Sequence, residues 1–250
     1  MMIVKELDFS NKNIVVTGAS SGIGREIAEY ISTLGANVIL IARNETALQK
    51  ITSEMTNSQY YSFDLNKINE IESLANKVKN DVGKISGIVY SAGIAPMRPL
   101  NLLKPENLLD VLRVNFLAYI ELVRCFTKKN ICETPMSIVS ISSVASFKGS
   151  KSKIAYAASK GAMDSANRCI AKELASKKIR VNSIQPSWVE TDMVKEYKKN
   201  FNSDYLNKSM DEQELGIIKP TDIAYTAAYL LSNMSSKITG TTIKITAGRL

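Results

Sequence analysis

The chain has 250 residues, of which 45% are hydrophobic and 22% charged, which is ordinary for one large globular domain with a substantial core. It contains no histidine, and its three cysteines lack metal-ligand spacing, so a histidine-based catalytic triad is excluded and no metal site is predicted. No apolar run approaches the roughly 18 residues that cross a membrane. We expect a cytoplasmic, disulfide-free protein that does not enter a membrane.

The net charge of +8 comes from 32 basic and 24 acidic residues. The basic residues are scattered, and the densest group, Lys195, Lys198, Lys199 and Lys208, is mixed with acidic residues and asparagines. A nucleic-acid site would join a basic stripe to interleaved aromatic residues. We therefore expect a solvated basic surface and no nucleic-acid partner.

In chain order, short apolar runs alternate with amphipathic segments of helical length. One helix is expected over Gly22–Ser32, a second passes through Leu48 and Ile51, and a third covers Ile68–Val82. The expected strands are Asn13–Thr17, Asn37–Ala42, Tyr60–Phe63, Ile88–Ser91, Ser137–Ile141, Ile179–Gln185 and Thr242–Ile245. Continuous apolar strands between helices predict an α/β fold, a doubly wound parallel sheet of the Rossmann type with helices on both faces. We expect residues 1–250 to form a single domain.

The one irregular region follows Pro186 and extends from Glu190 to Lys219. It is long and polar, and it comes after an expected strand. In sheets of this kind, ligands bind beyond the carboxyl ends of the strands. We therefore predict that residues 190–219 form a mobile lid over a substrate.

A glycine-rich turn, Thr17-Gly-Ala-Ser-Ser-Gly-Ile-Gly24, joins the first strand to the first helix. Its glycines permit a tight turn and a close approach of the backbone to a pyrophosphate, which the N-terminus of the following helix attracts. The spacing G-x-x-x-G-x-G differs from the commoner G-x-G-x-x-G. A turn built only for packing is the alternative, but the position at the first strand–helix junction favours a dinucleotide site.

The residues that end the second strand, Ala42-Arg43-Asn44, bear on which nicotinamide cofactor is bound. An acid here would accept hydrogen bonds from the adenosine ribose and repel a 2′-phosphate. Arg43 instead offers a phosphate a charge-assisted contact, typically worth about 1.5–3 kcal/mol. We predict NADP(H) rather than NAD(H), the alternative being an arginine on the solvated surface.

Tyr156 and Lys160 are four residues apart, and Ser143 precedes the tyrosine by thirteen residues. On a helix, this spacing places Tyr156 and Lys160 on the same face. We expect the ammonium to lower the tyrosine pKa from about 10, which would make the phenol a usable acid near neutral pH. Ser143 is expected to hold the oxygen of a substrate carbonyl, and Ser142 is the alternative for that role.

With the glycine turn, the serine, tyrosine and lysine, and the chain length together, the sequence resembles the short-chain dehydrogenase/reductase family over nearly its whole length. The resemblance implies that Asn115, in Arg-Val-Asn-Phe, completes a catalytic tetrad with Ser143, Tyr156 and Lys160. From its residue type alone, Asn115 could instead bond locally to helix backbone. The cofactor-binding residues predicted by the motifs and the resemblance are Gly18, Ser20, Ser21, Gly22, Ile23, Gly24, Arg43, Asn44, Asp64, Leu65, Ser91, Ala92, Gly93, Tyr156, Lys160, Pro186, Val189 and Thr191.

The same resemblance gives these residues their roles. Asp64 would contact the adenine ring, and Val189 and Thr191 would hold the nicotinamide carboxamide. Two positions depart from the family pattern. Ser91 replaces an asparagine, and Ser187 replaces the glycine that usually follows Pro186, which raises the question of the turn geometry there.

The implied reaction is hydride transfer between NADP(H) and a carbonyl or alcohol. Tyr156 would donate its proton to the carbonyl oxygen, and Ser143 would stabilise the negative charge that develops there. Lys160 would also bind the nicotinamide ribose. Asn115 would hold a water that links Lys160 to solvent.

The substrate is less constrained. The spacing from Gly93 to Asn115 is similar to that of 3-oxoacyl-[acyl-carrier-protein] reductases, whereas Glu133–Met136 and Phe147–Lys153 depart from their pattern. Basic residues that could meet an acidic carrier protein are Lys128, Lys129, Arg168 and Lys172. We expect a small carbonyl or alcohol substrate, with an acyl thioester as one alternative.

A second alternative is a non-catalytic, NADPH-sensing regulatory protein on the same fold. A pure sensor would need no proton relay, so the intact tetrad favours an enzyme. The resemblance also implies a homotetramer or homodimer, built on the helices that carry Asn115 and Tyr156.

Overall fold

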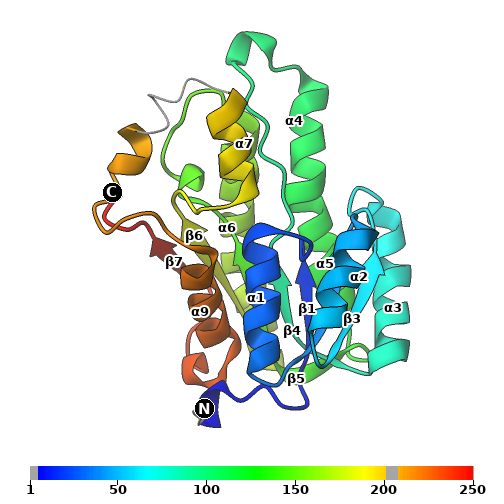
Figure 1. Cartoon of the computed structure of the whole chain (residues 1–250). Coiled ribbons are helices and arrows are strands. Elements are labelled where there is room, and N and C mark those ends of the chain that lie inside the picture. Colours follow the sequence, from blue (N-terminus) through cyan, green and yellow to red (C-terminus); the bar gives the residue numbers. More distant parts are fainter. Residues whose placement is uncertain (1–4, 201–207, 250) are drawn as a thin grey trace.

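The computed structural model describes residues 5–200 and 208–249. Its centre is a parallel sheet of seven strands in the order β3-β2-β1-β4-β5-β6-β7 (Figure 1). The strands are β1 Asn13–Thr17, β2 Asn37–Ala42, β3 Ser58–Ser62, β4 Ile85–Tyr90, β5 Cys132–Ile141, β6 Ile179–Pro186 and β7 Thr242–Ile245. The order reverses between β1 and β4, and this is where a doubly wound sheet opens a crevice for a ligand.

Helices cover both faces of the sheet. The face in front in Figure 1 carries α1 Gly22–Thr33, α2 Glu45–Glu54 and α9 Pro220–Leu231. The other face carries α3 Ile71–Val82, α5 Ala118–Phe126 and α6 Ile154–Leu174, while α4 Pro105–Leu112 and α7 Asp192–Asn200 rise beyond the carboxyl ends of the strands. Short helical turns lie at Lys5–Leu7, Ile68–Glu70, Leu100–Leu102, Val144–Ser146, Ala175–Lys177 and Asn233–Ser235, and a π-helical turn at Arg113–Leu117. No helix in the described ranges is long and apolar enough to cross a membrane.

Alternate residues of each strand point to opposite faces, so the sheet separates two hydrophobic cores. Val15 of β1 packs with the core under α3, α5 and α6, whereas Ile14 and Val16 pack with the core under α1 and α9. The predicted fold class is therefore confirmed, because continuously apolar strands are what a sheet covered on both faces requires.

Three strands begin earlier than the sequence predicts. β3 begins two residues early, at Ser58, and β4 covers Ile85–Tyr90 rather than Ile88–Ser91. β5 begins at Cys132, five residues before the expected start, and its pairing with β4 is irregular between Ile85 and Gly87. The polar Glu133-Thr-Pro stretch hides this beginning, since backbone pairing and not an apolar pattern defines it.

The region expected to be irregular, Glu190 to Lys219, contains helix α7. Val189 and Ile218, at its two ends, form an isolated parallel bridge. The two ends of the segment therefore lie side by side. Residues 201–207 of the predicted lid lie outside the described residues. The described part thus has regular structure close to the sheet, which the polar composition of the segment did not reveal.

Candidate active site

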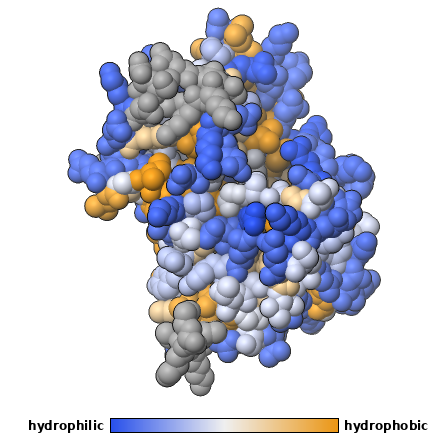
Figure 2. Space-filling model, viewed as in Figure 1, coloured by the Kyte–Doolittle hydropathy of each residue, from blue (hydrophilic) through white to orange (hydrophobic). Residues whose placement is uncertain are grey.

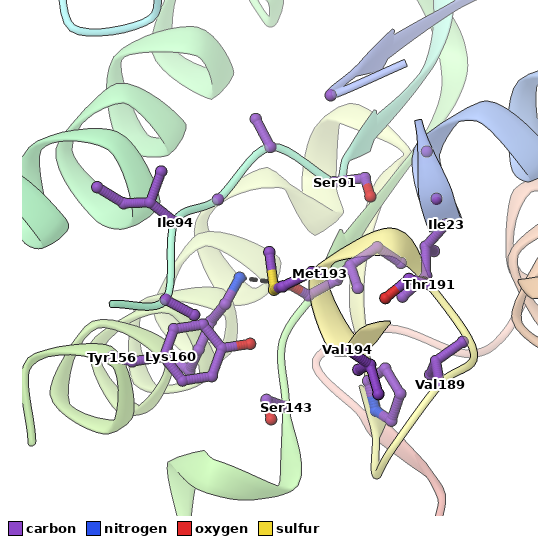
Figure 3. Close-up of a pocket in the computed structure, with 18 of the residues that line it drawn as sticks. Ile23, Ser91, Ile94, Ser143, Tyr156, Lys160, Val189, Thr191, Met193 and Val194 are labelled. Carbon is purple, nitrogen blue, oxygen red and sulfur yellow. Dashed lines mark hydrogen bonds between the residues drawn. The ribbon is translucent and has the colours of Figure 1, made fainter. Parts of the chain in front are cut away.

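A cavity of about 470 Å³ opens at the carboxyl ends of the central strands. Every predicted cofactor residue lines it, as do Ser143, Tyr156 and Lys160 of the predicted tetrad. In Figure 3 the hydroxyl of Tyr156 points into the cavity between Lys160 and Ser143, with Met193 and Thr191 on the opposite side. Asn115 is the exception, since it is fully buried behind the wall.

The glycine turn is shaped by close backbone contacts. Gly18 has a φ of +65°, and a Cβ there would lie 2.9 Å from backbone atoms of Ala92. A Cβ at Gly24 would lie 2.5 Å from the carbonyl oxygen of Gly18. Close packing therefore requires glycine at these two positions, which was the alternative explanation of the turn. The same contacts hold the turn at the mouth of the cavity, so packing and cofactor binding are compatible.

The N-terminus of α1 faces the same cavity and is suited to an anion. Ser21 precedes the helix without a side-chain cap, and no acidic residue lies in the first turn. The early N–H groups and the helix dipole are therefore not neutralised by the protein's own carboxylates. A cofactor pyrophosphate fits this chemistry.

The residues at the end of β2 also suit a phosphate. Arg43 is exposed, lines the cavity, and forms no ion pair with a carboxylate of the described residues. Two neighbouring cofactor candidates have local roles as well. Asn44 caps α2 by accepting a hydrogen bond of 3.1 Å from the N–H of Ala47, and Asp64 accepts bonds from the backbone and side chain of Asn66.

Asn115 lies in the π-helical turn between α4 and α5, a kind of distortion that is frequent at functional sites. Its side chain accepts a hydrogen bond of 2.8 Å from the N–H of Ile94 and donates bonds of 2.9 Å to the carbonyl of Ile94 and to Ser159. These partners are far away in the sequence, so the alternative of a local side-chain bond to helix backbone is not what the structure shows. Asn115 instead fixes the loop after β4 against α6.

The predicted effect of Lys160 on Tyr156 needs correction. Burial raises the pKa of Tyr156 above its usual value, hydrogen bonding with Ser143 opposes this, and the charge of Asp164 adds to it. The Lys160 ammonium lies 5.7 Å from the centroid of the tyrosine ring and donates a hydrogen bond of 2.7 Å to the carbonyl of Ile141. Desolvation of the phenol is thus the largest effect on its pKa, and the predicted net lowering is not found.

The two neighbouring serines have different partners. Ser142 is buried and donates a hydrogen bond of 2.8 Å to the carboxylate of Asp164, which also accepts bonds from Ser183 and Gln185. The Ser143 hydroxyl accepts a bond from the N–H of Ala145 and interacts with Tyr156. This geometry favours Ser143 over Ser142 for contact with a substrate oxygen.

The segment after β6 closes one side of the cavity. Thr191 approaches Gly22, where a Cβ would lie 3.4 Å from the threonine methyl group. Ser187, at the position where the family usually has glycine, does not have a positive φ, so serine brings no backbone strain. Its hydroxyl accepts a hydrogen bond of 3.3 Å from Arg249, which connects the turn to the end of the chain.

Several residues that line the cavity were not predicted. Lys153 precedes Tyr156 by three residues, and Tyr197 and Met193 come from α7. Trp188 and Arg249 line the wall next to Ser187. Only the nearness of Lys153 to Tyr156 in the sequence could have indicated its place, because the other contacts depend on tertiary structure.

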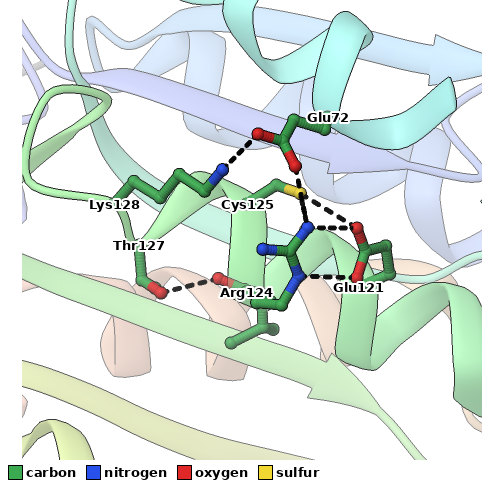
Figure 4. Close-up of polar contacts among 7 residues, drawn as sticks. Glu72, Glu121, Arg124, Cys125, Thr127 and Lys128 are labelled. Carbon is green, nitrogen blue, oxygen red and sulfur yellow. Dashed lines mark hydrogen bonds and ion pairs between the residues drawn. The ribbon is translucent and has the colours of Figure 1, made fainter. Parts of the chain in front are cut away.

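A separate polar cluster lies between α3 and α5 (Figure 4). Glu72, Glu121 and Cys125 bring three potential metal ligands within 4.8 Å of one another. However, Arg124 forms ion pairs of 2.9 and 2.7 Å with the two carboxylates, and Lys128 pairs with Glu72. The cluster is therefore an ion-pair network. Lys128 was predicted as a possible contact for an acidic carrier protein, but its ammonium is already paired with Glu72.

Comparison with known proteins agrees with this geometry. The family model described as enoyl-(acyl carrier protein) reductase matches residues 18–249. L-xylulose reductase of Caenorhabditis elegans is 34% identical, over 96% of this chain and 96% of the relative. The 3-oxoacyl-[acyl-carrier-protein] reductase FabG of Escherichia coli is 29% identical, over 97% of this chain and 98% of the relative.

Solved structures show the same architecture. A short-chain dehydrogenase/reductase from Brucella melitensis, described as a glucose/ribitol dehydrogenase, has a TM-score of 0.90 at 29% identity and covers 97% of this chain and 98% of its own. A Beutenbergia cavernae protein provisionally described as an NAD(P)-dependent gluconate 5-dehydrogenase, with NADP bound at low occupancy, has a TM-score of 0.89 at 26% identity and 98% coverage of both chains.

The chain therefore belongs to the short-chain dehydrogenase/reductase family and is an oxidoreductase of that family. The predicted family, enzyme class and fold are confirmed. The predicted cofactor agrees with the NADP in the Beutenbergia structure. The relatives act on different substrates according to their names, so the family alone does not select the substrate.

Proposed function

We propose that the protein is an NADP(H)-dependent reductase of small carbonyl compounds, acting in reverse on the corresponding alcohols. The observation that carries this proposal is one cavity that joins the glycine turn and Arg43 to Tyr156, Ser143 and Lys160. A pure NADPH sensor would need the first group of residues and not the second. The proton-transfer residues therefore favour an enzyme over the sensor.

The bound nicotinamide supplies a hydride to the carbonyl carbon. Tyr156 donates its phenolic proton to the carbonyl oxygen, and Ser143 donates a hydrogen bond to that oxygen while it gains negative charge. Lys160 would hold the nicotinamide ribose when the cofactor is bound, and would return a proton to Tyr156. Asn115 positions the loop after β4 and supports a water that links Lys160 to solvent.

Arg43 supports NADP(H) over NAD(H). Its guanidinium can bind the 2′-phosphate in a forked arrangement, and no acid at the end of β2 competes for the ribose hydroxyls. The N-terminus of α1 would hold the pyrophosphate. Asp64 and Leu65 would contact adenine, and Pro186, Val189 and Thr191 would hold the nicotinamide.

The segment from 190 to 219 is proposed as the substrate lid. Three side chains of α7, those of Met193, Val194 and Tyr197, line the same cavity as Tyr156, which supports this role. Because its two ends meet at the Val189–Ile218 bridge, the segment can move about one hinge region.

A homotetramer or homodimer is part of the proposal. Apolar side chains are exposed on α4, on the π-helical turn that carries Asn115, and on α6, with Leu109 55%, Leu117 46% and Ile154 42% exposed. On the face drawn in Figure 2 apolar side chains form small separate patches among hydrophilic ones. Light scattering in solution would measure the mass of the assembly.

Replacement of Tyr156 by phenylalanine tests the function. We expect Tyr156→Phe to bind NADPH with unchanged affinity and to lose about 10²–10⁴-fold in turnover, because only the proton donor is removed. The measurement is NADPH consumption over a set of aldehydes, ketones, ketoses, quinones and 3-oxoacyl thioesters. Tyr225→Phe, at an exposed tyrosine on α9, is the matched control.

If the wild-type protein binds NADPH but reduces none of these carbonyls, the sensor is favoured. If Tyr156→Phe keeps substantial activity, Tyr156 is not the acid. A preference for 3-oxoacyl thioesters on a carrier protein over the same free thioesters would favour the carrier-protein reductase. Lys129, Arg168 and Lys172 are exposed and could form that contact.

A further inference from the structure

Lys153 is a cation buried beside the proposed proton donor. Only 7% of its surface is exposed, and its ammonium lies 5.7 Å from the centroid of the Tyr156 ring, the same distance as that of Lys160. Lys153 lines the cavity from the N-terminal end of α6. Nothing in the proposed proton relay uses it.

The polar partners of Lys153 are neutral. Its Nζ donates a hydrogen bond of 2.7 Å to the carbonyl oxygen of Ala95 and one of 2.8 Å to the hydroxyl of Tyr197. The Tyr197 hydroxyl in turn donates to the same carbonyl, and its ring lies 3.9 Å from the ammonium. An ammonium has three N–H donors, so these two acceptors leave one donor for another group.

No carboxylate among the described residues forms an ion pair with Lys153. Arg43 and Lys151 also line the cavity without an ion pair among the described residues, but both are exposed to solvent, whereas the remaining cations have a negative partner. Arg249 and Lys148 both pair with Glu212, and Lys160 feels the negative charge of buried Asp164. Burial alone acts on Lys153 and lowers its pKa to about 8, so it remains charged at neutral pH.

A buried charge without a counter-charge lowers stability, and it is retained where a ligand supplies the opposite charge. The three groups around this ammonium come from three elements: the Ala95 carbonyl from the loop after β4, the Tyr156 ring from α6, and Tyr197 from α7 of the proposed lid. An anion that enters the cavity would therefore meet a desolvated cation in a fixed position. In such surroundings a charge-assisted hydrogen bond is strong.

We propose that Lys153 binds the carboxylate of the substrate, and that the substrates of this enzyme are short oxo acids and the matching hydroxy acids. The proposal rests on the proposed function, since Tyr156 and Ser143 must hold the carbonyl next to that carboxylate. Tyr197 positions the ammonium from the lid side. A neutral thioester or sugar would leave the Lys153 charge without a counter-ion.

The experiment compares each acid with its own methyl ester, which differs from it chiefly in lacking the charge. The probes are 2-oxobutanoate, 3-oxobutanoate and their methyl esters, with NADPH consumption as the measurement. We expect wild type to have a higher kcat/KM for at least one acid than for its ester. Lys153→Met should lower kcat/KM for the acid by about 10–150-fold, from the usual strength of a charge-assisted hydrogen bond, and for the ester by less than about 3-fold.

Two controls keep the result interpretable. Lys177→Met removes the same charge from an exposed lysine beyond the end of α6 and should leave both substrates unaffected. NADPH affinity and thermal unfolding of Lys153→Met show whether the variant is folded. In addition, butanoate, which cannot be reduced, should compete with a neutral carbonyl substrate in wild type and lose this inhibition in Lys153→Met.

The outcomes separate the two proposals. Equal losses for acid and ester, or butanoate inhibition that survives in Lys153→Met, would overturn the carboxylate role and leave a structural lysine. Activity on esters with no activity on acids would also overturn it while the reductase stands. If no carbonyl is reduced although NADPH binds, the reductase itself fails; butanoate binding measured by calorimetry then still tests Lys153.

Discussion

The ammonium of Lys160 donates a hydrogen bond of 2.7 Å to the carbonyl oxygen of Ile141, and so connects α6 to the end of β5. Ile141 lies two residues before Ser143, so this bond fixes the position of Lys160 on α6 relative to Ser143 at the end of β5. Burial lowers the pKa of Lys160 to about 8, and the charge of Asp164, one helical turn further along α6, opposes the change. The protonation of Lys160 thus depends on a carboxylate that does not line the cavity.

Asp164→Asn should move the pH profile of turnover to lower pH by about one unit or less. The carboxylate raises the pKa of Lys160 and that of Tyr156, so removal of its charge lowers both. The amide can keep the local hydrogen bonds, because the Ser183 hydroxyl, which also contacts Thr242, can accept from the new N–H. The measurement is kcat from pH 5 to 10.

Glu173→Gln provides the control for Asp164→Asn, since it removes the same charge from an exposed site on the same helix. Its profile should superimpose on that of wild type. An Asp164→Asn profile that is lower at every pH but unshifted would show that the carboxylate acts only through packing.

The two buried lysines should make the protein more stable as the pH rises from about 8 to 10. Burial lowers the pKa of Lys153 and of Lys160 to about 8, whereas unfolded lysines titrate near 10.4. In this window the unfolded chain binds more protons than the folded one, so the free energy of unfolding increases by up to about 1.4 kcal/mol per pH unit for each lysine. Above pH 10 the buried tyrosines act in the opposite direction, because burial raises the pKa of Tyr197.

Urea unfolding at intervals between pH 7.5 and 10 measures this dependence. Lys153→Met should reduce the slope by about half and leave the m-value unchanged. A slope equal to that of wild type would mean that Lys153 is neutral or solvated in the folded protein across the window.

The positions of the strands and of the glycine turn followed from the sequence, since buried parallel strands are apolar throughout and Gly18 needs a positive φ. The start of β5 did not, because Cys132 pairs with Ile85 through the backbone alone. Asn115 was identified through the family pattern, but its contacts with Ile94 and Ser159 exist only in the folded chain.

Lys153 shows most clearly what a sequence omits. A lysine near a helix start predicts a solvated side chain. Its burial depends on Ala95, 58 residues earlier, and on Tyr197, 44 residues later. The rise in the pKa of Tyr156 could not be predicted for the same reason. Desolvation depends on all the residues around the phenol, whereas the four-residue spacing describes only Lys160.

Arg43→Ala should weaken binding of NADPH by about 10–150-fold, which corresponds to the loss of one charge-assisted contact, and leave NADH affinity within about 3-fold. Fluorescence titration with each cofactor measures the two affinities. Arg43 does not stabilise the fold through an ion pair with any described carboxylate, so the melting temperature without cofactor should be unchanged. Equal losses for both cofactors would remove Arg43 from the 2′-phosphate.

Gly24→Ala should lower the free energy of unfolding by about 1–3 kcal/mol, although alanine favours helices by about 1 kcal/mol over glycine. The reason is that the new Cβ would lie 2.5 Å from the carbonyl oxygen of Gly18, a backbone atom that can move only if the whole turn moves. Gly161→Ala is the matched control, because its Cβ would lie 3.5 Å from the Ser146 carbonyl, an ordinary contact. Urea unfolding should therefore show a loss of stability for the first variant and a small gain, or none, for the second. If both variants gain stability, the contact between α1 and the glycine turn is loose enough to relax, and packing does not require glycine at position 24.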